Sequence, residues 1–367
     1  KTPIVRSRLC TPVRCVEVNG ITVVGERINP TGKKRLQQAL REGDSAYACA
    51  QAVAQAEAGA ELLDVNAGLP DIDEPATLEM LVRELQSITD LPLQLDSSNK
   101  DALARALRIY NGKPIVNSVN GEQKVLDSIL PLCKKYGAAV VGLALDEHGI
   151  PKTAEGRFEV AKRIVAATDA IGIPRGDVYI DCLTLTVSAQ QDQAEETLAA
   201  VRTVHRDMGL QTVLGVSNIS FGLPNRLLMT QTFLIRALNE GLTLPIINPN
   251  QKEIMDAVAA FRVLSGEDEA CAAYEEGAFD AVYIASPNAL HIPQSEYFLG
   301  HGINVLCEKP MAMNTAEALE MEECARRNGK LLMIGFVRRH GNDCARSGDR
   351  TDKVRTRRDR TDTLGAV

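Results

Sequence analysis

The sequence predicts an α/β fold in which eight parallel strands close into a (β/α)8 TIM barrel, followed by a partial Rossmann-like α/β fragment and a disordered tail. Two observations predict the barrel. Short β-branched or apolar runs alternate with longer stretches of helical period along residues 21–264, which is the pattern of repeated βα units. Eight such runs occur in this part of the chain, and eight strands within about 250 residues match a barrel better than an open sheet.

The composition agrees with this class and excludes others. Hydrophobic residues make up 45% of the chain, whereas only 4% are aromatic and Trp is absent, which suits a helix-covered parallel sheet. The formal net charge of −7 argues against a nucleic-acid-binding surface. No run approaches the roughly 18 apolar residues of a membrane span, and no secretion signal opens the chain, so we expect a cytoplasmic protein. The nine cysteines include no C-x-x-C pair, and we expect them to be reduced thiols.

The elements follow in order from these periodicities. Residues 1–18 precede the first apolar run and are expected to form a linker, and residues 19–272 are expected to form the barrel. The strands are expected at residues 21–25, 62–65, 91–95, 114–116, 138–145, 178–180, 212–216 and 244–247. Apolar residues recur every three to four positions in the clearest helices, so these should form the outer ring. Those helices span residues 35–58, 154–171 and 194–208.

Polar side chains follow the expected strands at their carboxyl ends, where a barrel brings all strand ends to one face. These residues are Glu26, Asn29, Asp64, Asn66, Asp96, Ser97, Asn117, Asn120, Asp146, Asp181, Ser217, Asn218 and Asn248. Asp and Asn also begin turns and cap helices, so a single position has little weight. A polar residue at every strand end indicates a binding site at the mouth of the barrel.

The residue types at this mouth favour one kind of ligand. They are rich in Asp and Asn and poor in Lys and His, which suits a neutral heterocycle with adjacent N–H donors better than a phosphate. A pterin fits, because its amino-pyrimidine edge offers two neighbouring donors to one carboxylate. The alternative is a metal site, and without clustered His or Cys it would hold only Mg²⁺ or Ca²⁺.

Six motifs in the barrel region carry a specific resemblance. They are VVGERINPTGKK at residues 23–34, LLDVNAG at 62–68, LDSSN at 95–99, NSVNGE at 117–122, GLALDEHGIP at 142–151 and GVSNISFGLPNR at 215–226. In this order they resemble the pterin-binding domain of methionine synthase and related corrinoid methyltransferases. Dihydropteroate synthases share this barrel and are the alternative, but their first strand reads differently, and a cationic site for pyrophosphate is not evident in this sequence.

The resemblance implies a reaction and a set of roles. A methyl group would pass from 5-methyltetrahydrofolate, the substrate, to the Co(I) form of a corrinoid, as the folate half-reaction of methionine synthesis. The cobalamin would be supplied by another domain or chain. Asn218 and Asp181 would be catalytic. The substrate-binding residues would be Glu26, Asn29, Asp64, Asp96, Asn117, Asp181, Ser217 and Asn218, with Asp96, Asn117 and Asp181 on the pterin ring and Asn218 beside the methyl-bearing nitrogen.

The sequence changes character beyond residue 271. FDAVYIASPNALH at 279–291, INVLCEKPMAMN at 303–314 and KLLMIGFVRRH at 330–340 resemble the Gfo/Idh/MocA oxidoreductases over residues 274–340. Lys309 matches the cofactor-binding Lys of that family's EKP motif, here as a vestige, because no G-x-G-x-x-G turn precedes it. The alternatives to a methyltransferase are therefore an NAD(P)-dependent sugar-type oxidoreductase fragment and a nonfunctional hybrid of two genes. Residues 341–367 are expected to be disordered.

Overall fold

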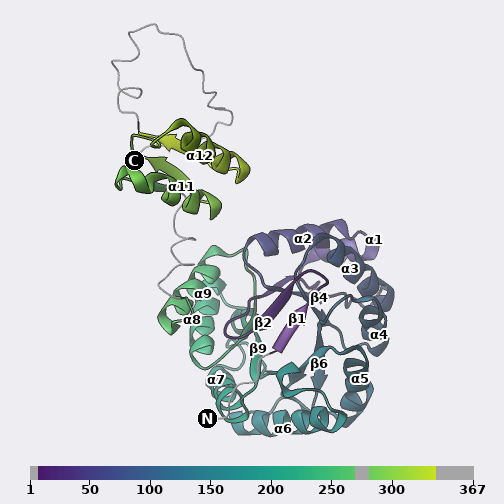
Figure 1. The fold of residues 1–367 in the computed structure, drawn as a ribbon. Helices are drawn as coiled ribbons and strands as arrows, with labels where there is room; N and C mark the ends of the chain where they lie inside the picture. The colour runs from purple at the N-terminus through teal and green to yellow at the C-terminus, as the bar shows by residue number, and fades with distance from the viewer. Residues whose placement is uncertain (1–6, 269–280, 336–367) are drawn as a thin grey trace. The chain divides into compact units, whose positions relative to one another are not determined.

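The computed structural model describes residues 7–268 and 281–335, which belong to two compact units, Lys1–Ala270 and Cys271–Val367 (Figure 1). The two units are described separately. The expected tail at residues 341–367 and the first six residues of the expected linker lie outside the described residues.

The first unit is a closed barrel of eight parallel strands in the order β10-β3-β4-β5-β6-β7-β8-β9, which confirms the predicted TIM barrel. The strands are β3 (Val24–Ile28), β4 (Leu62–Asn66), β5 (Leu93–Asp96), β6 (Ile115–Asn120), β7 (Ala139–Leu143), β8 (Val178–Asp181), β9 (Gln211–Gly215) and β10 (Leu244–Ile247). The first strand begins three residues later than the expected 21–25. It therefore carries Glu26 within the strand.

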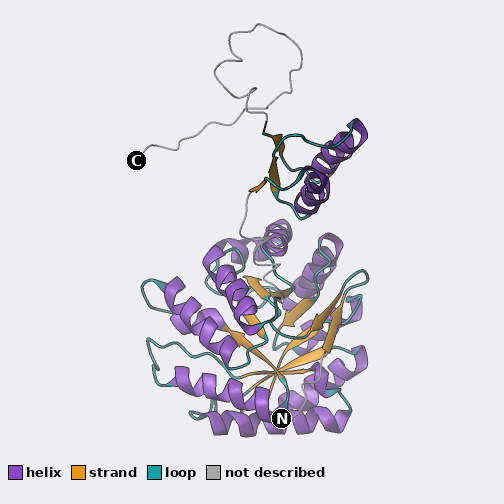
Figure 2. Cartoon of the chain, turned by 60° about the vertical axis from the view of Figure 1, so that its left-hand side comes forward, coloured by secondary structure: helices purple, strands orange, loops and turns teal. Residues whose placement is uncertain are grey.

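Helices form a ring around the strands (Figures 1 and 2). They are α1 (Lys34–Glu42), α2 (Ala46–Glu57), α3 (Glu74–Ile88), α4 (Lys100–Ile109), α5 (Gln123–Tyr136), α6 (Ala154–Ile171), α7 (Gln193–Thr203), α8 (Arg226–Asn239) and α9 (Lys252–Ser265). The single helix expected over 35–58 is wrong, because Gly43 takes a left-handed φ of 67° and ends α1. The Asp44 carboxylate then accepts a hydrogen bond from the Ala46 N–H, which starts α2.

The residues expected as a linker instead form an antiparallel hairpin from Ser7 onward, with β1 (Ser7–Cys10) paired to β2 (Cys15–Val18). Leu9 and Val18 are fully buried against residues that begin the barrel strands, so the hairpin covers the amino-terminal end of the barrel. Those barrel residues include Val24, Leu62, Ile115, Ala139 and Leu244. The linker expectation failed because alternation over two four-residue strands is too short a signal to distinguish a hairpin from an extended segment.

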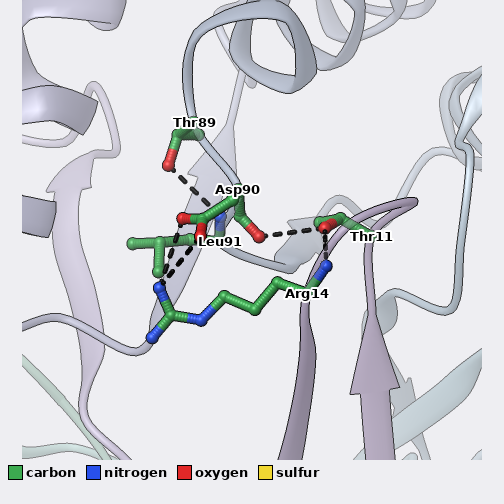
Figure 3. A network of polar contacts seen from close by, with 5 residues as sticks. All are labelled: Thr11, Arg14, Thr89, Asp90 and Leu91. Carbon is green, nitrogen blue, oxygen red and sulfur yellow. Dashed lines mark hydrogen bonds and ion pairs between the residues drawn. The ribbon is translucent and has the colours of Figure 1, made fainter.

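Polar contacts hold the turn of this hairpin to the loop before β5 (Figure 3). The Thr11 hydroxyl donates to the Asp90 carbonyl at 3.0 Å, and the Arg14 guanidinium pairs with the Asp90 carboxylate at 3.2 Å. Because the hairpin covers the amino-terminal end of the barrel, the interior of the barrel is open at the carboxyl ends of the strands.

The second unit contains a three-stranded parallel sheet in the order β11-β12-β13. Its described elements are β11 (Ala281–Ile284), α11 (His291–Gly300), β12 (Asn304–Cys307), α12 (Thr315–Arg327) and β13 (Leu332–Ile334). Ile284, Leu299 and Met321 share its small core. This agrees with the predicted Rossmann-like fragment of three strands and two helices.

Candidate active site

A cavity of about 650 Å³ lies at the carboxyl ends of the barrel strands. All eight residues predicted to bind substrate line it: Glu26, Asn29, Asp64, Asp96, Asn117, Asp181, Ser217 and Asn218. They come from β3 and the loop directly after it, from β4, β5, β6 and β8, and from the turn after β9. Residues separated by up to 192 positions in the chain therefore face one space.

Three of the other polar strand-end residues, Asn120, Asp146 and Asn248, do not line this cavity and have local roles instead. Asn120 and Asn248 accept hydrogen bonds from the N–H groups two residues later. Asp146 does the same for His148 and pairs with Arg163. Those positions of the strand-end pattern follow turn chemistry rather than ligand binding.

Two acidic side chains of the cavity, Asp64 and Asp96, are held only by neutral amides. The Asp64 carboxylate accepts from Gln94 at 2.7 Å and from Asn117 at 3.4 Å. Asp96 accepts from Asn66 at 2.9 Å and from Asn29 at 3.4 Å. Among the described residues, neither carboxylate forms an ion pair.

Burial without a cation favours the protonated form of both acids. Burial, and then the nearby Asp96 charge, raises the pKa of Asp64 well above its ordinary value. Burial likewise raises the pKa of Asp96 to about 6, against the effect of the Asn66 hydrogen bond. A ligand that brings adjacent N–H donors would therefore satisfy carboxylates that the protein itself leaves without a charged partner.

Asp181 ends β8 at the opposite side of the cavity from Asp64. Its carboxylate accepts a hydrogen bond from the Leu183 N–H at 2.7 Å, and Leu183 takes a left-handed φ of 65°. Such a φ is strained for a branched side chain and persists only where the surroundings hold it. Burial raises the pKa of Asp181 to about 7, so this carboxyl titrates near neutral pH.

The group that holds this loop is Arg157, a fully buried side chain of α6 that no sequence pattern marks as part of the site. Its guanidinium donates to the carbonyls of Pro151, Cys182 and Leu183. It also donates to Thr197 at 2.6 Å and to Gln193 at 2.8 Å. All five acceptors are neutral, and the Cys182 and Leu183 carbonyls directly follow Asp181.

Asn218 lies on the short helical turn Val216–Ser220 after β9 and is exposed to the cavity. Its carboxamide forms no hydrogen bond with another described residue. A Cβ at position 215 would stand 2.9 Å from the Asn218 Nδ2, so Gly215 leaves the space that this side chain occupies. The neighbouring Ser217 hydroxyl donates to the Glu26 carboxylate at 2.8 Å.

The expectation of a mouth poor in cations needs correction. Arg27, Lys33 and Arg226 also line the cavity. Burial lowers the pKa of Lys33, whose ammonium donates to the carbonyls of Glu26 and Asn29 at 3.0 Å each. All three cations lie within the first and last of the six motifs. The sequence therefore contained these residues in the site motifs, but nothing distinguished them from Lys and Arg residues on the surface.

No group of three or more potential metal-ligating side chains occurs within residues 7–268 and 281–335. None of the described helices combines the length and the apolar character needed to span a bilayer.

Lys309, the predicted cofactor-binding residue, is exposed two residues after the end of β12 in the second unit and is not among the residues that line the barrel cavity.

Comparisons with known proteins divide the chain into two parts, as the two compact units of the structure do. Residues 25–248 match the family described as pterin binding enzyme. Residues 231–336 match an oxidoreductase family with an NAD-binding Rossmann fold.

Two curated relatives cover the barrel. A methylcorrinoid:tetrahydrofolate methyltransferase of Eubacterium limosum is 30% identical over 262 residues, which cover 69% of this chain and 94% of that protein. A methionine synthase of Mycobacterium leprae (strain TN) is 32% identical over 258 residues, 67% of this chain. The match spans only 21% of that methionine synthase.

Solved structures support the fold alone. The dihydropteroate synthase of Yersinia pestis has a TM-score of 0.53 at 15% identity, covering 71% of this chain and 98% of that one. The 7,8-dihydropteroate synthase of Vibrio fischeri ES114 has a TM-score of 0.56 at 15% identity, with coverage of 71% and 99%.

Proposed function

The chain belongs to the family of pterin-binding enzymes, and we propose that its barrel binds a methylated reduced folate and exchanges the methyl group with a corrinoid carried by another domain or chain. The observation that carries this proposal is the meeting of Asp64, Asp96 and Asp181 with carboxamides in one cavity, without an ion pair to any of these three acids among the described residues. The two curated relatives, one named a methylcorrinoid:tetrahydrofolate methyltransferase and the other a methionine synthase, support it.

Recognition of the pterin follows from the carboxylates. The pyrimidine edge of a pterin presents an amino group and a ring N–H side by side, which match the two oxygens of one carboxylate. Asp96 is the best placed, because its remaining partners are amides that can shift to make room. Asn117 and Asp181 can then pair with the remaining ring nitrogens and the carbonyl, as neutral or charged partners near neutral pH.

Methyl transfer requires help at the folate nitrogen, because a tertiary amine is a poor leaving group. A corrinoid held by another domain or chain would supply the Co(I) nucleophile for the methyl group, and a proton on the folate nitrogen would let the folate leave as a neutral amine. The Asn218 carbonyl, which has no hydrogen bond to another described residue, can accept a hydrogen bond from that protonated nitrogen. This interaction strengthens as positive charge develops, so it lowers the barrier more than it tightens binding.

Asp181 is suited to supply or relay that proton, because its carboxyl titrates close to pH 7. The same groups serve the reverse reaction, from methyl-cobalt to tetrahydrofolate, since both directions share one transition state. We infer the direction from 5-methyltetrahydrofolate to Co(I), as in the folate half-reaction of methionine synthesis, from the six motifs.

Calorimetric titration of the full chain with 5-methyltetrahydrofolate, beside stopped-flow transfer to free cob(I)alamin, tests the proposal. Asp96→Asn should weaken folate binding by about 10- to 100-fold, the value of a hydrogen-bonded charge. Asn218→Ala should lower the transfer rate by about 100-fold and change affinity by less than about threefold. Asp146→Asn, at a strand end outside the cavity, is the matched control. Absence of folate binding, or equal effects of both variants on rate and affinity, would contradict the assignment.

A further inference from the structure

Apart from Glu26 of β3, whose carboxylate accepts a hydrogen bond from Ser217, the charged residues that line the mouth of the barrel divide into two sectors. Asp64 lies within β4, and Asp96 and Asp181 end β5 and β8. Arg27 and Lys33 lie at the end of β3 and in the loop after it, and Arg226 begins α8 after β9. Only β10 separates β3 from β9 in the closed barrel, so the three cations gather on one side.

A hydrogen bond joins the two loops that carry these cations. The Ser217 hydroxyl, after β9, donates to the Glu26 carboxylate of β3 at 2.8 Å and so crosses the space above β10. The basic sector is therefore a continuous part of the cavity wall.

The three cations have neutral hydrogen-bond acceptors. Arg27 donates to Gln51 at 3.4 Å, Lys33 donates to two backbone carbonyls, and Arg226 donates to the Ser220 hydroxyl and the Ser217 carbonyl. Across residues 7–268, none of the three forms an ion pair with a carboxylate. Since an Arg or Lys usually gains from an anionic partner where water is partly excluded, this sector is prepared for an anion from outside the protein.

An aromatic face stands next to this sector. The Arg226 guanidinium lies 4.4 Å from the centroid of the Phe221 ring, which is 46% exposed and also lines the cavity. Asn218 lies three residues before Phe221, on the turn after β9, and β9 neighbours β8 with its Asp181. From the acids to the cations, the wall therefore offers carboxylates, a carboxamide, an aromatic ring and positive charge.

We propose that Arg27, Lys33 and Arg226 form a carboxylate-binding subsite that holds the anionic tail of the folate while the acidic sector holds its pterin ring. This inference rests on the proposed function. A reduced folate presents its groups in the same order as the wall, with the pterin first, the methyl-bearing nitrogen next, then an aminobenzoyl ring and finally glutamate carboxylates. The subsite thus selects folates with a tail, and longer glutamate chains bind more tightly.

The test compares three probes by calorimetric titration of the full chain: 5,6-dimethyltetrahydropterin, which has no tail, 5-methyltetrahydrofolate, and its triglutamate. Wild-type protein should bind the monoglutamate at least about tenfold more tightly than the tail-less pterin. Arg226→Gln and Arg27→Gln should each remove about tenfold of folate affinity and leave the affinity for the tail-less pterin unchanged. Arg226→Lys, which keeps the charge, should restore part of the loss. Arg83→Gln, which removes an Arg paired with Glu79 on α3, is the control.

Added salt should weaken binding of the folates but not of the tail-less pterin. Equal affinity of wild-type protein for the pterin and the folates would overturn the subsite while leaving the proposed function intact. Failure of all three probes to bind would overturn the proposed function itself, and the subsite with it. Micromolar binding of inorganic diphosphate that is lost in Arg226→Gln would assign the cations to a phosphate-bearing substrate and also overturn the subsite.

Discussion

Replacing Asp181 by Asn should stabilise the ligand-free barrel above neutral pH, although it removes a residue that we place in the site. Asp181 ends β8 among groups that offer its carboxylate little compensation for burial, and this raises its pKa to about 7. In the unfolded chain the same carboxyl returns to about 3.9. Asn has the same shape and keeps an oxygen for the Leu183 N–H, whose hydrogen bond measures 2.7 Å.

The sign and the size of the effect follow from proton linkage. Between about pH 4 and pH 7 the folded protein holds a proton on Asp181 that the unfolded chain has lost, so stability falls as the pH rises through this window. The difference of about 3 pH units corresponds to an upper limit of ~4 kcal/mol above pH 7. Water in the cavity screens part of this, and we expect a gain of about 2–4 kcal/mol for Asp181→Asn at pH 8 and none below pH 4.

Urea denaturation at pH 4, 6 and 8, followed by circular dichroism, measures this difference directly. Asp146→Asn is the control, because the pKa of Asp146 is shifted in the opposite direction. The His148 N–H and the Arg163 partner hold the pKa of Asp146 below its usual range, so this substitution should not stabilise the protein at pH 8. An Asp181→Asn variant whose stability relative to wild type is the same at pH 4 and pH 8 would refute the argument that Asp181 is buried without compensation.

Three further substitutions test other parts of the structure. Arg157→Met removes the guanidinium that holds the loop after Asp181, and we expect it to lower the free energy of unfolding in urea by about 3 kcal/mol. Because Arg157 lowers the pKa of Asp181, the pH midpoint of folate binding should also shift upward. An unchanged midpoint would contradict the coupling between Arg157 and Asp181. Gly215→Ala places a methyl group against Asn218. It should slow methyl transfer at least about tenfold in stopped flow and lower the free energy of unfolding by less than about 1 kcal/mol. An unaltered rate would mean that the position of Asn218 does not affect methyl transfer. Leu9→Ala leaves a void under the hairpin and should cost about 2–4 kcal/mol in urea unfolding; a loss below about 1 kcal/mol would show that the hairpin does not seal the barrel.

The barrel could be predicted because each of its strands is a separate local signal. Runs such as residues 244–247 are apolar on both faces, as buried parallel strands must be, and β10 occupies the expected positions. The helix α6 also has the predicted bounds. Two predictions about local structure were wrong. The hairpin of β1 and β2 was expected to be a linker, and α1 and α2 were expected to be one helix despite Gly43 between them.

The candidate site was predictable to a similar extent and for the same reason. In a barrel the carboxyl ends of all strands share one face, so the sequence alone predicts that Asp64, Asp96 and Asp181 lie near one another. The cations Arg27 and Lys33 were overlooked because most Lys and Arg are on the surface, and no local pattern marks the ones that face a cavity.

The number and order of the strands, and the polar residues that follow them, can be predicted from local patterns, because these depend on periodicity over a few neighbouring residues. Three features appear only in the folded chain: Arg157 is buried behind Asp181, the hairpin closes one end of the barrel, and most charges at the other end separate into two sectors. These features depend on distances between segments far apart in the chain. Burial and the electric field at a site arise from everything that packs around it, and no local stretch of sequence contains that information.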